Sequence, residues 1–62
     1  MARFSQVEIN ALFFEGETGE YYRKMDEVSS TVYDMDNKCD FTDTDGSILI
    51  SIFPENHQVE DI

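Results

Sequence analysis

Residues 7–25, VEINALFFEGETGEYYRKM, decide the fold that we predict for this chain of 62 residues. From residue 4 to residue 14, apolar and polar side chains largely alternate with the period of two that is typical of a β-strand. Residues 15–19 follow with two glycines among polar residues, a composition that favours a hairpin loop. Residues 20–25 then predict the returning strand of an antiparallel hairpin.

The apolar period changes after this hairpin. Four apolar residues are spaced by 4, 3 and 4 positions, which places them along one face of an α-helix: Val28, Val32, Met35 and Cys39. We therefore expect a helix over residues 30–40, with hydroxyl groups of residues 29–31 as N-caps. Val32 and Met35 would then pack into the core. Cys39 would face inward as an inert thiol, and Tyr33 would stay at least partly exposed.

The most apolar stretch lies near the end of the chain. After a polar link with an Asp45-Gly46 turn, residues 47–53 read SILISIF. Ile48, Ile50 and Ile52 share one face of the predicted strand, and we expect them to be mostly buried. Such a strand is either central in its sheet or covered by a second subunit. Pro54 ends it.

The predicted fold class is therefore α+β, in the order β-β-α-β: a three-stranded antiparallel sheet with one helix packed on a face. The chain forms a single domain over residues 1–62. Its ordered core extends over about 4–54, and an acidic tail over 55–62 is expected to fray.

Size and composition favour self-association. A chain of this length buries only about 60% of its unfolded surface, so its own core is marginal. One cysteine allows no intramolecular disulfide, and one Cys with one His makes no Cys/His zinc site. We therefore expect a homodimer, in which the dimer or core residues are Ile48, Ile50, Ile52, Val32 and Met35.

The charge limits the possible functions. Fourteen Asp and Glu residues against four Lys and Arg give a net charge of −10, which has the wrong sign for direct binding to nucleic acid. No apolar run approaches the ~20 residues that span a membrane. A lone free thiol and the lack of a signal peptide predict a cytoplasmic protein.

We find no support for catalysis, a metal or a cofactor in the sequence. Asp43-x-Asp45-Gly46 resembles part of a calcium loop, but Phe41 and Ile52 would then occupy positions that require oxygen ligands. His57 lies in the predicted tail, where a surface histidine without a role is expected. The protein is therefore predicted not to be an enzyme.

Regularly spaced carboxylates can instead imitate a nucleic-acid backbone. Alternate residues on a strand lie about 7 Å apart, and residues i and i+4 of a helix about 6 Å apart. A cationic groove that normally receives phosphates would accept such a surface, and electrostatic steering would speed the encounter. A solvated acidic face that only keeps the protein soluble is the alternative.

The order of features resembles the small dimeric uracil-DNA glycosylase inhibitors of Bacillus phages. The matching features run from an alternating strand and an acidic turn, through a tyrosine pair and a serine-capped helix, to an Ile-rich strand. In this chain they are residues 7–14, 15–19, Tyr21-Tyr22, Ser29-Ser30, Tyr33-Asp34-Met35 and residues 48–53.

The resemblance implies a homodimer whose acidic surface fills the DNA-binding cleft of the glycosylase. It also implies an apolar pocket at the dimer interface, built partly from the helix aromatic, for the residue that the enzyme inserts into the minor groove. By position, Tyr33 would be this pocket aromatic. This chain departs from the family in two side chains. Asn37 stands where the family has a second helix aromatic, and Phe41 would substitute for that missing ring. Arg23 stands where the family has an acid after the tyrosine pair. The predicted partner-binding residues are Tyr33, Asp34, Asn37, Glu20, Tyr22, Asp36 and Phe41.

If the gene belongs to a phage, the protein would act in the cytoplasm of the bacterial host. The alternative function is an acidic adaptor or inhibitor of another basic nucleic-acid-binding protein or of a toxin.

Overall fold

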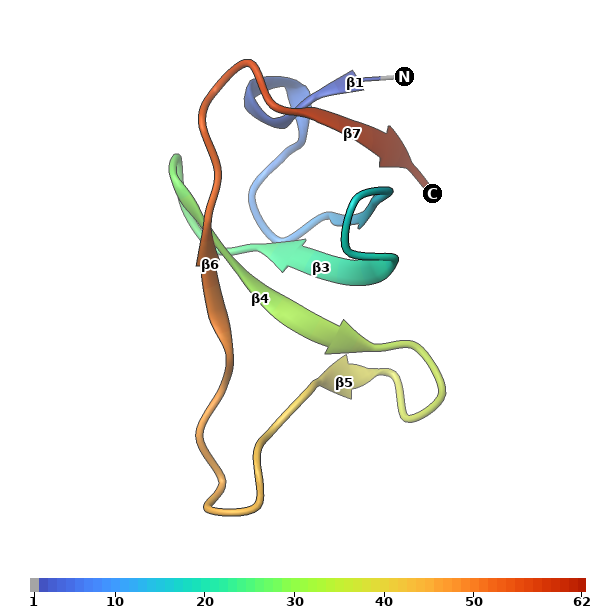
Figure 1. Ribbon diagram of the computed structural model, residues 1–62, viewed down its shortest axis with the longest axis vertical. Helices are drawn as coiled ribbons and strands as arrows, with labels where there is room; N and C mark the ends of the chain where they lie inside the picture. The colour runs from blue at the N-terminus through green and yellow to red at the C-terminus, as the bar shows by residue number, and fades with distance from the viewer. Residues whose placement is uncertain (1) are drawn as a thin grey trace.

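The computed structural model describes residues 2–62 and shows short antiparallel strands in one strongly bent sheet (Figure 1). The elements are β1 (Ala2–Arg3), the 3₁₀ turn η1 (Phe4–Gln6), β2 (Leu12–Glu15), β3 (Glu20–Lys24), β4 (Ser29–Asp34), β5 (Cys39–Asp40), β6 (Ile50–Ile52) and β7 (Gln58–Asp61). The strand order is β1-β7-β2-β3-β4-β5, and β6 also pairs with β4. The C-terminal strand thus lies between two N-terminal ones.

The predicted hairpin is present. Phe13 pairs with Tyr22 and Glu15 pairs with Glu20, so that β2 and β3 flank a four-residue turn. The N–H of Gly19 donates to the carbonyl of Glu15 at 2.9 Å. Gly19 has φ +73°, a conformation that glycine adopts without steric cost. The two glycines of the loop therefore indicated the turn correctly.

The first predicted strand is much shorter than the alternation suggested. Residues 4–11 form η1 and a turn rather than a strand, and only residues 12–15 belong to β2. Asn10 has φ +74°, and its N–H donates to the carbonyl of Lys24 at 2.7 Å. Asparagine tolerates this left-handed conformation better than most residues, so the chain bends there and the period of two is broken.

The predicted helix over residues 30–40 is wrong, and with it the α+β fold class. Residues 29–34 form β4, and the only helical residues within 2–62 are those of η1. Thr31, Val32 and Tyr33 are β-branched or aromatic and pack well on a pleated surface. The hydroxyls of Ser30 and Thr31 are buried in the sheet rather than capping a helix.

The 4-3-4 spacing arises from two strand segments joined by a turn. Asp34 Oδ1 accepts the N–H groups of Asp36 at 3.0 Å and of Asn37 at 3.2 Å, which is the local bonding of a turn-forming aspartate. Lys38 has φ +56° and completes the reversal into β5. Cys39 lies on β5 and is exposed, so the expectation that it faces inward is also wrong.

The Ile-rich segment is an edge of the sheet rather than its centre. β6 pairs only with β4 among residues 2–62, and the exposed fractions are 38% for Ile48, 55% for Ile50 and 68% for Ile52. The predicted burial of these side chains is therefore wrong within one chain, because the bent sheet places them on its outer side. Phe53, at 7% exposed, is the residue of this segment that enters the core.

The expected frayed tail is wrong as well. β7 pairs with β1 through Val59 and Ala2 and with β2 through Glu60 and Phe14. Val59 is only 2% exposed. Val59 is the one apolar residue of β7, so the sequence of this strand shows no alternation of apolar and polar side chains. Its burial nevertheless anchors β7 against the core.

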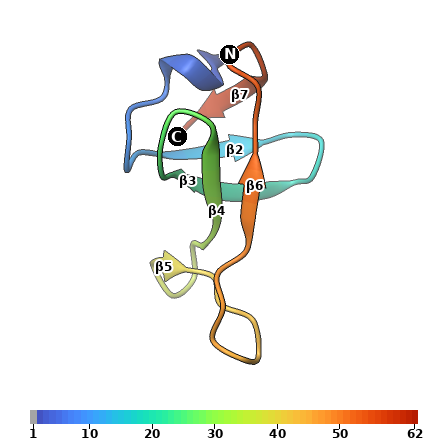
Figure 2. The ribbon, with the colours of Figure 1, turned by 90° about the vertical axis from the view of Figure 1, so that its left-hand side faces the viewer.

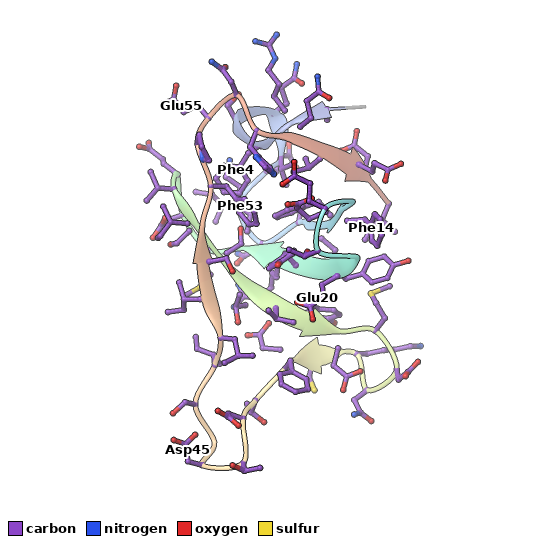
Figure 3. All side chains as sticks on the ribbon, viewed as in Figure 1. Phe4, Phe14, Glu20, Asp45, Phe53 and Glu55 are labelled. Carbon is purple, nitrogen blue, oxygen red and sulfur yellow. The ribbon has the colours of Figure 1, made fainter. Side chains whose placement is uncertain are left out.

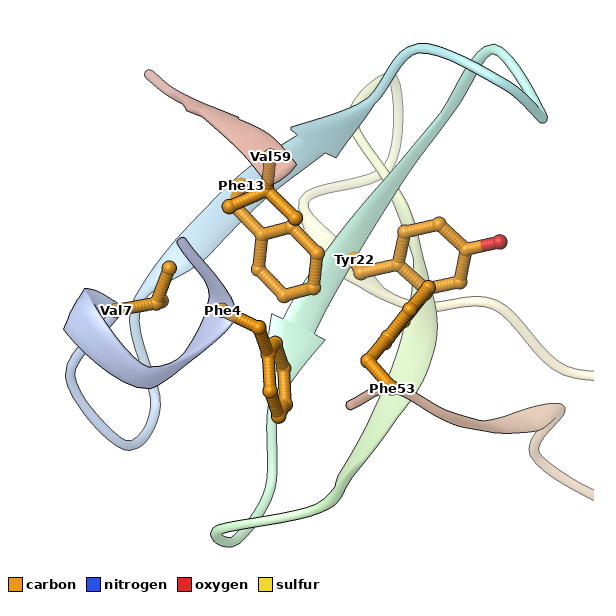
Figure 4. Packing of buried hydrophobic residues seen from close by; sticks show 6 residues of the cluster. All are labelled: Phe4, Val7, Phe13, Tyr22, Phe53 and Val59. Atoms are coloured by element: carbon orange, nitrogen blue, oxygen red, sulfur yellow. The ribbon is translucent and has the colours of Figure 1, made fainter. Parts of the chain in front are cut away.

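Six side chains form the core, and most of them are aromatic (Figure 4). They are Phe4, Val7, Phe13, Tyr22, Phe53 and Val59. The Phe53 ring centroid lies 5.4 Å from that of Phe4, 5.7 Å from that of Phe13 and 5.2 Å from that of Tyr22. The core therefore joins the first turn, the hairpin and the segment before β7.

Lys24 is buried beside these rings. Its Nζ donates to the carbonyls of Phe4 and Val7, both at 2.9 Å, and lies 4.4 Å from the centre of the Phe4 ring. A buried ammonium group is tolerated only when hydrogen bonds replace its hydration. Lys24 thus holds the N-terminal segment against β3.

The molecule is elongated, with extents of 32 × 20 × 20 Å. The link between β5 and β6 projects from the body at the end opposite to β1 and β7 (Figure 1). A second view shows β4 and β6 side by side, running across β2 and β3 (Figure 2).

A pair of substitutions tests whether the C-terminal strand belongs to the folded core. Val59→Asp places a carboxylate among aromatic rings, and we expect it to lower the melting temperature by about 12 °C or more, because it costs about 3 kcal/mol or more. Gln58→Asp adds the same charge at the exposed neighbouring position, and we expect little change. Circular-dichroism melting curves measure both. Equal effects of the two variants would mean that β7 is not anchored.

Candidate binding hollow on an acidic surface

A shallow hollow of about 380 Å³ lies between the β3–β4 sheet and the segment that follows β5. We call it the acidic hollow. It is lined by Gly19, Glu20, Tyr21, Val32, Tyr33, Asp34, Met35, Asp36 and Phe41. Its residues thus come from three separate parts of the sequence.

Aromatic side chains form the apolar part of the hollow. Tyr33 is half-buried on β4, where its backbone pairs with Asp40 of β5. Phe41 follows directly, and its N–H donates to the carbonyl of Val32 at 2.8 Å, which fixes Phe41 beside β4. Tyr21 contributes a third ring from β3 and is exposed. Phe41 is itself 41% exposed.

Three carboxylates surround these rings: Glu20, Asp34 and Asp36. Hydrogen bonds from Asn37, first from its backbone N–H and then from its side chain, hold the pKa of Asp34 below its ordinary value. The Asn37 amide donates to Asp34 Oδ2 at 2.7 Å. Asp34 therefore remains ionised at neutral pH, and the hollow combines apolar surface with fixed negative charge.

The structure brings together five of the seven residues that we predicted to bind a partner. Glu20, Tyr33, Asp34, Asp36 and Phe41 all line the acidic hollow. Their contact with a partner stays a prediction.

The other two predicted residues lie elsewhere. Tyr22 is 3% exposed and belongs to the core. Asn37 does not line the hollow but supports Asp34 from the adjacent turn.

Val32 and Met35, which we predicted to be core or dimer residues, line the hollow as well. Val32 is half-buried and Met35 is 38% exposed. Tyr21 also lines the hollow, although it is not among the predicted partner-binding residues. The signal was available, because Tyr21 alternates with the buried Tyr22 on a strand and must face the opposite side.

Two of the four basic side chains form contacts within the molecule. Lys24 is buried. Arg23 forms a two-pronged pair with Asp40, with Nε–Oδ1 2.9 Å and Nη2–Oδ2 2.8 Å. Arg3 and Lys38 remain exposed.

The carboxylates are spread over the molecule rather than gathered on one side. Figure 3 shows Glu55 near one end of the long axis, Asp45 at the other and Glu20 between them. The acidic hollow is one place where carboxylates lie beside exposed aromatic side chains.

No match to this chain was found among protein-family models, curated proteins or solved structures. Within residues 2–62, no helix has the length and apolar character required to cross a membrane.

The Arg23–Asp40 pair predicts a specific pH dependence. The hydrogen bond from Arg23 holds the pKa of Asp40 below its ordinary value. The pair therefore stabilises the fold fully above about pH 4, the range of an unfolded aspartate, and this contribution is lost as the pH falls through the lower pKa of the folded state.

We expect Asp40→Asn to lower the melting temperature at pH 7 by about 4–8 °C, which corresponds to about 1 kcal/mol. The difference from the unsubstituted protein should shrink as the pH falls below 4. Glu27→Gln, at an exposed position, serves as the control and should cause no such difference. A deficit for Asp40→Asn that stayed constant down to pH 2 would contradict this assignment.

Proposed function

We propose that this protein is a non-catalytic acidic binding protein that docks on the cationic surface of a nucleic-acid-binding protein. The observation that supports the proposal most directly is the acidic hollow, where Tyr21, Tyr33 and Phe41 lie among carboxylates. Steering by the net charge of −10 would bring the partner close. Apolar contacts in the hollow would then supply residence time.

The first partner to test is uracil-DNA glycosylase. In this proposal the acidic protein imitates DNA, fills the DNA-binding cleft of the enzyme and so inhibits it. A base-flipping enzyme exposes an apolar wedge beside a phosphate-binding groove. A hollow of about 380 Å³ with aromatic walls and an acidic rim is complementary to both features. In this proposal Tyr33 contacts the wedge, and Glu20 and Asp36 lie against the groove.

The resemblance to the phage inhibitors supports this partner only in part. The serine-capped helix that it implied is absent, because Ser29 and Ser30 lie on β4. What remains is the hairpin, the tyrosine pair and the position of Tyr33-Asp34-Met35. The alternative partner is another cationic nucleic-acid-binding protein, such as a restriction nuclease or polymerase, or a toxin.

The proposed site of action is the cytoplasm. Cys39 is exposed and carries a free thiol. Exposed thiols persist in reducing compartments, and the proposed partners act there.

An inhibition assay with matched charge variants tests the function. Excision of uracil from a duplex is measured with increasing amounts of this protein, at 50 and 200 mM salt. We expect stoichiometric inhibition that weakens at the higher salt concentration. The double variant Glu20→Gln/Asp36→Asn should bind at least about tenfold more weakly, whereas Glu8→Gln/Glu27→Gln, with the same change in charge, should lose about twofold.

Tyr33→Ala should weaken inhibition more than any single Asp→Asn change, and Tyr33→Phe should retain it because the ring is kept. Full glycosylase activity at a several-fold excess of this protein would reject this enzyme as the partner. Failure to bind any of a panel of cationic nucleic-acid-binding proteins or toxins would contradict the wider proposal.

We also propose that the protein forms a homodimer through the open edge of β6. The N–H of Val32 donates to the carbonyl of Leu49 at 3.0 Å, and the N–H of Phe53 to that of Val28 at 2.8 Å. Since the peptide groups of an antiparallel strand alternate in direction, those of Ile50 point away from β4. An unpaired edge of this kind is a template for another strand.

The side chains along this edge favour a second copy over a charged partner. No charged residue occurs between Gly46 and Glu55, so two acidic molecules repel each other least here. Pairing of two β6 strands would continue the sheet and bring the exposed Ile50 and Ile52 side chains of the two copies beside each other.

A single substitution tests this interface. Ile50→Lys adds charge to the open edge of β6, and we expect it to convert a dimer into a monomer of about half the mass in light-scattering chromatography. Ile9→Lys is the matched control, because Ile9 has the same exposed fraction of 55% but lies outside β6. A monomeric unsubstituted protein at 100 μM, or a dimer that survives Ile50→Lys, would contradict the proposal.

A further inference from the structure

A buried carboxylate meets the histidine that the sequence analysis had placed in a frayed tail. Glu15, at the end of β2, is only 3% exposed. Its Oε2 lies 3.0 Å from Nε2 of His57, which precedes β7. The pair joins segments that are 42 residues apart in the sequence.

His57 is held firmly in this position. Its carbonyl accepts the N–H of Phe4 at 2.8 Å, and its own N–H donates to the carbonyl of Pro54 at 3.0 Å. The imidazole packs on the core, with its centroid 5.1 Å from that of the Phe53 ring. The ring is therefore preorganised and points Nε2 towards Glu15.

Glu17 brings a second carboxylate to the same place. One ligand atom from each of Glu15, Glu17 and His57 lies within 4.8 Å of the others. The turn supports this approach, because the N–H of Glu17 donates to Glu15 Oε1. Among residues 2–62, no Lys or Arg nitrogen forms a salt bridge with either carboxylate.

Two carboxylates that converge at a partly buried site repel each other. Within residues 2–62, His57 is the one side chain that forms an ion pair with either of them, and only when it is protonated. An ionised carboxylate also offers about four acceptor sites, and Glu15 uses one oxygen for the Glu17 N–H and the other for His57. A divalent ion would neutralise both carboxylates at once.

The ligand chemistry selects the ion. Imidazole nitrogen with carboxylate oxygen suits Zn²⁺, whereas Ca²⁺ and Mg²⁺ prefer oxygen ligands alone. Glu15 Oε2 and His57 Nε2, which lie 3.0 Å apart, fit around one ion at bond lengths of about 2.0–2.2 Å, and the Glu17 ligand atom lies within 4.8 Å of both. A depression of about 300 Å³ beside the cluster, lined in part by Glu15, Glu17 and Glu60, leaves room for water or for a further carboxylate.

We propose that Glu15, Glu17 and His57 form a binding site for one Zn²⁺ ion, which fastens the C-terminal strand to the β2–β3 hairpin. Small domains commonly need such a fastening, because their own core is marginal. The site shares no residue with the acidic hollow, so it stands independently of the proposed function.

Calorimetric titration of the metal-free protein with ZnCl₂ tests the site, with thermal melting as a second readout. We expect one Zn²⁺ per chain, and at a hundredfold excess over Kd a rise in melting temperature of about 10 °C or more. Ca²⁺ and Mg²⁺ should give no comparable rise.

Variants distinguish this site from general attraction to an acidic surface. Glu17→Gln changes an exposed residue and should weaken Zn²⁺ binding at least about tenfold while the metal-free fold is kept. His57→Gln should abolish the thermal effect. Glu8→Gln, which removes the same charge elsewhere, is the control and should bind Zn²⁺ normally.

Either of two results would overturn the proposal. The first is no stoichiometric binding of Zn²⁺ by the unsubstituted protein. The second is binding of several ions per chain that Glu17→Gln and Glu8→Gln weaken equally, which would show that the carboxylates act only as a diffuse negative surface.

Discussion

The packing of Phe53 against three other rings is the contact on which the rest of the structure depends. Phe53 meets Phe4 from the first turn and Phe13 and Tyr22 from the hairpin. Because these residues lie far apart in the chain, one cluster closes the sheet into a bent structure with an inner and an outer side. Burial of large aromatic side chains supplies most of the available hydrophobic free energy in so small a domain.

Two of the four basic side chains are engaged inside this closed structure. Lys24 is drawn inside because the carbonyls of Phe4 and Val7 and the face of a ring replace its hydration. Arg23 is engaged by Asp40. Each of these contacts is balanced by an acid, because Arg23 neutralises Asp40 and the buried Glu15 offsets Lys24. The exterior is strongly negative because the chain has fourteen acidic and only four basic side chains.

The same inner and outer division explains where the possible binding sites lie. Tyr21 and Tyr22 are neighbours in sequence, yet one lies in the acidic hollow and the other in the core. The Ile-rich segment divides likewise, with Phe53 inside and Ile50 outside. A bent sheet this small cannot cover both faces of its strands, so apolar side chains remain on the outer face, available to partners.

The sequence alone determined the hairpin, the two turns at Gly19 and Gly46, and the negative charge, because turn conformations and charge depend on local residue types. Tertiary structure decided whether residues 29–34 form a helix or a strand, because a 4-3-4 apolar spacing fits either a helix or two strands around a turn. Pairing of β7 with β2, and the meeting of Glu15 with His57, likewise depend on contacts between distant segments, which no local pattern encodes.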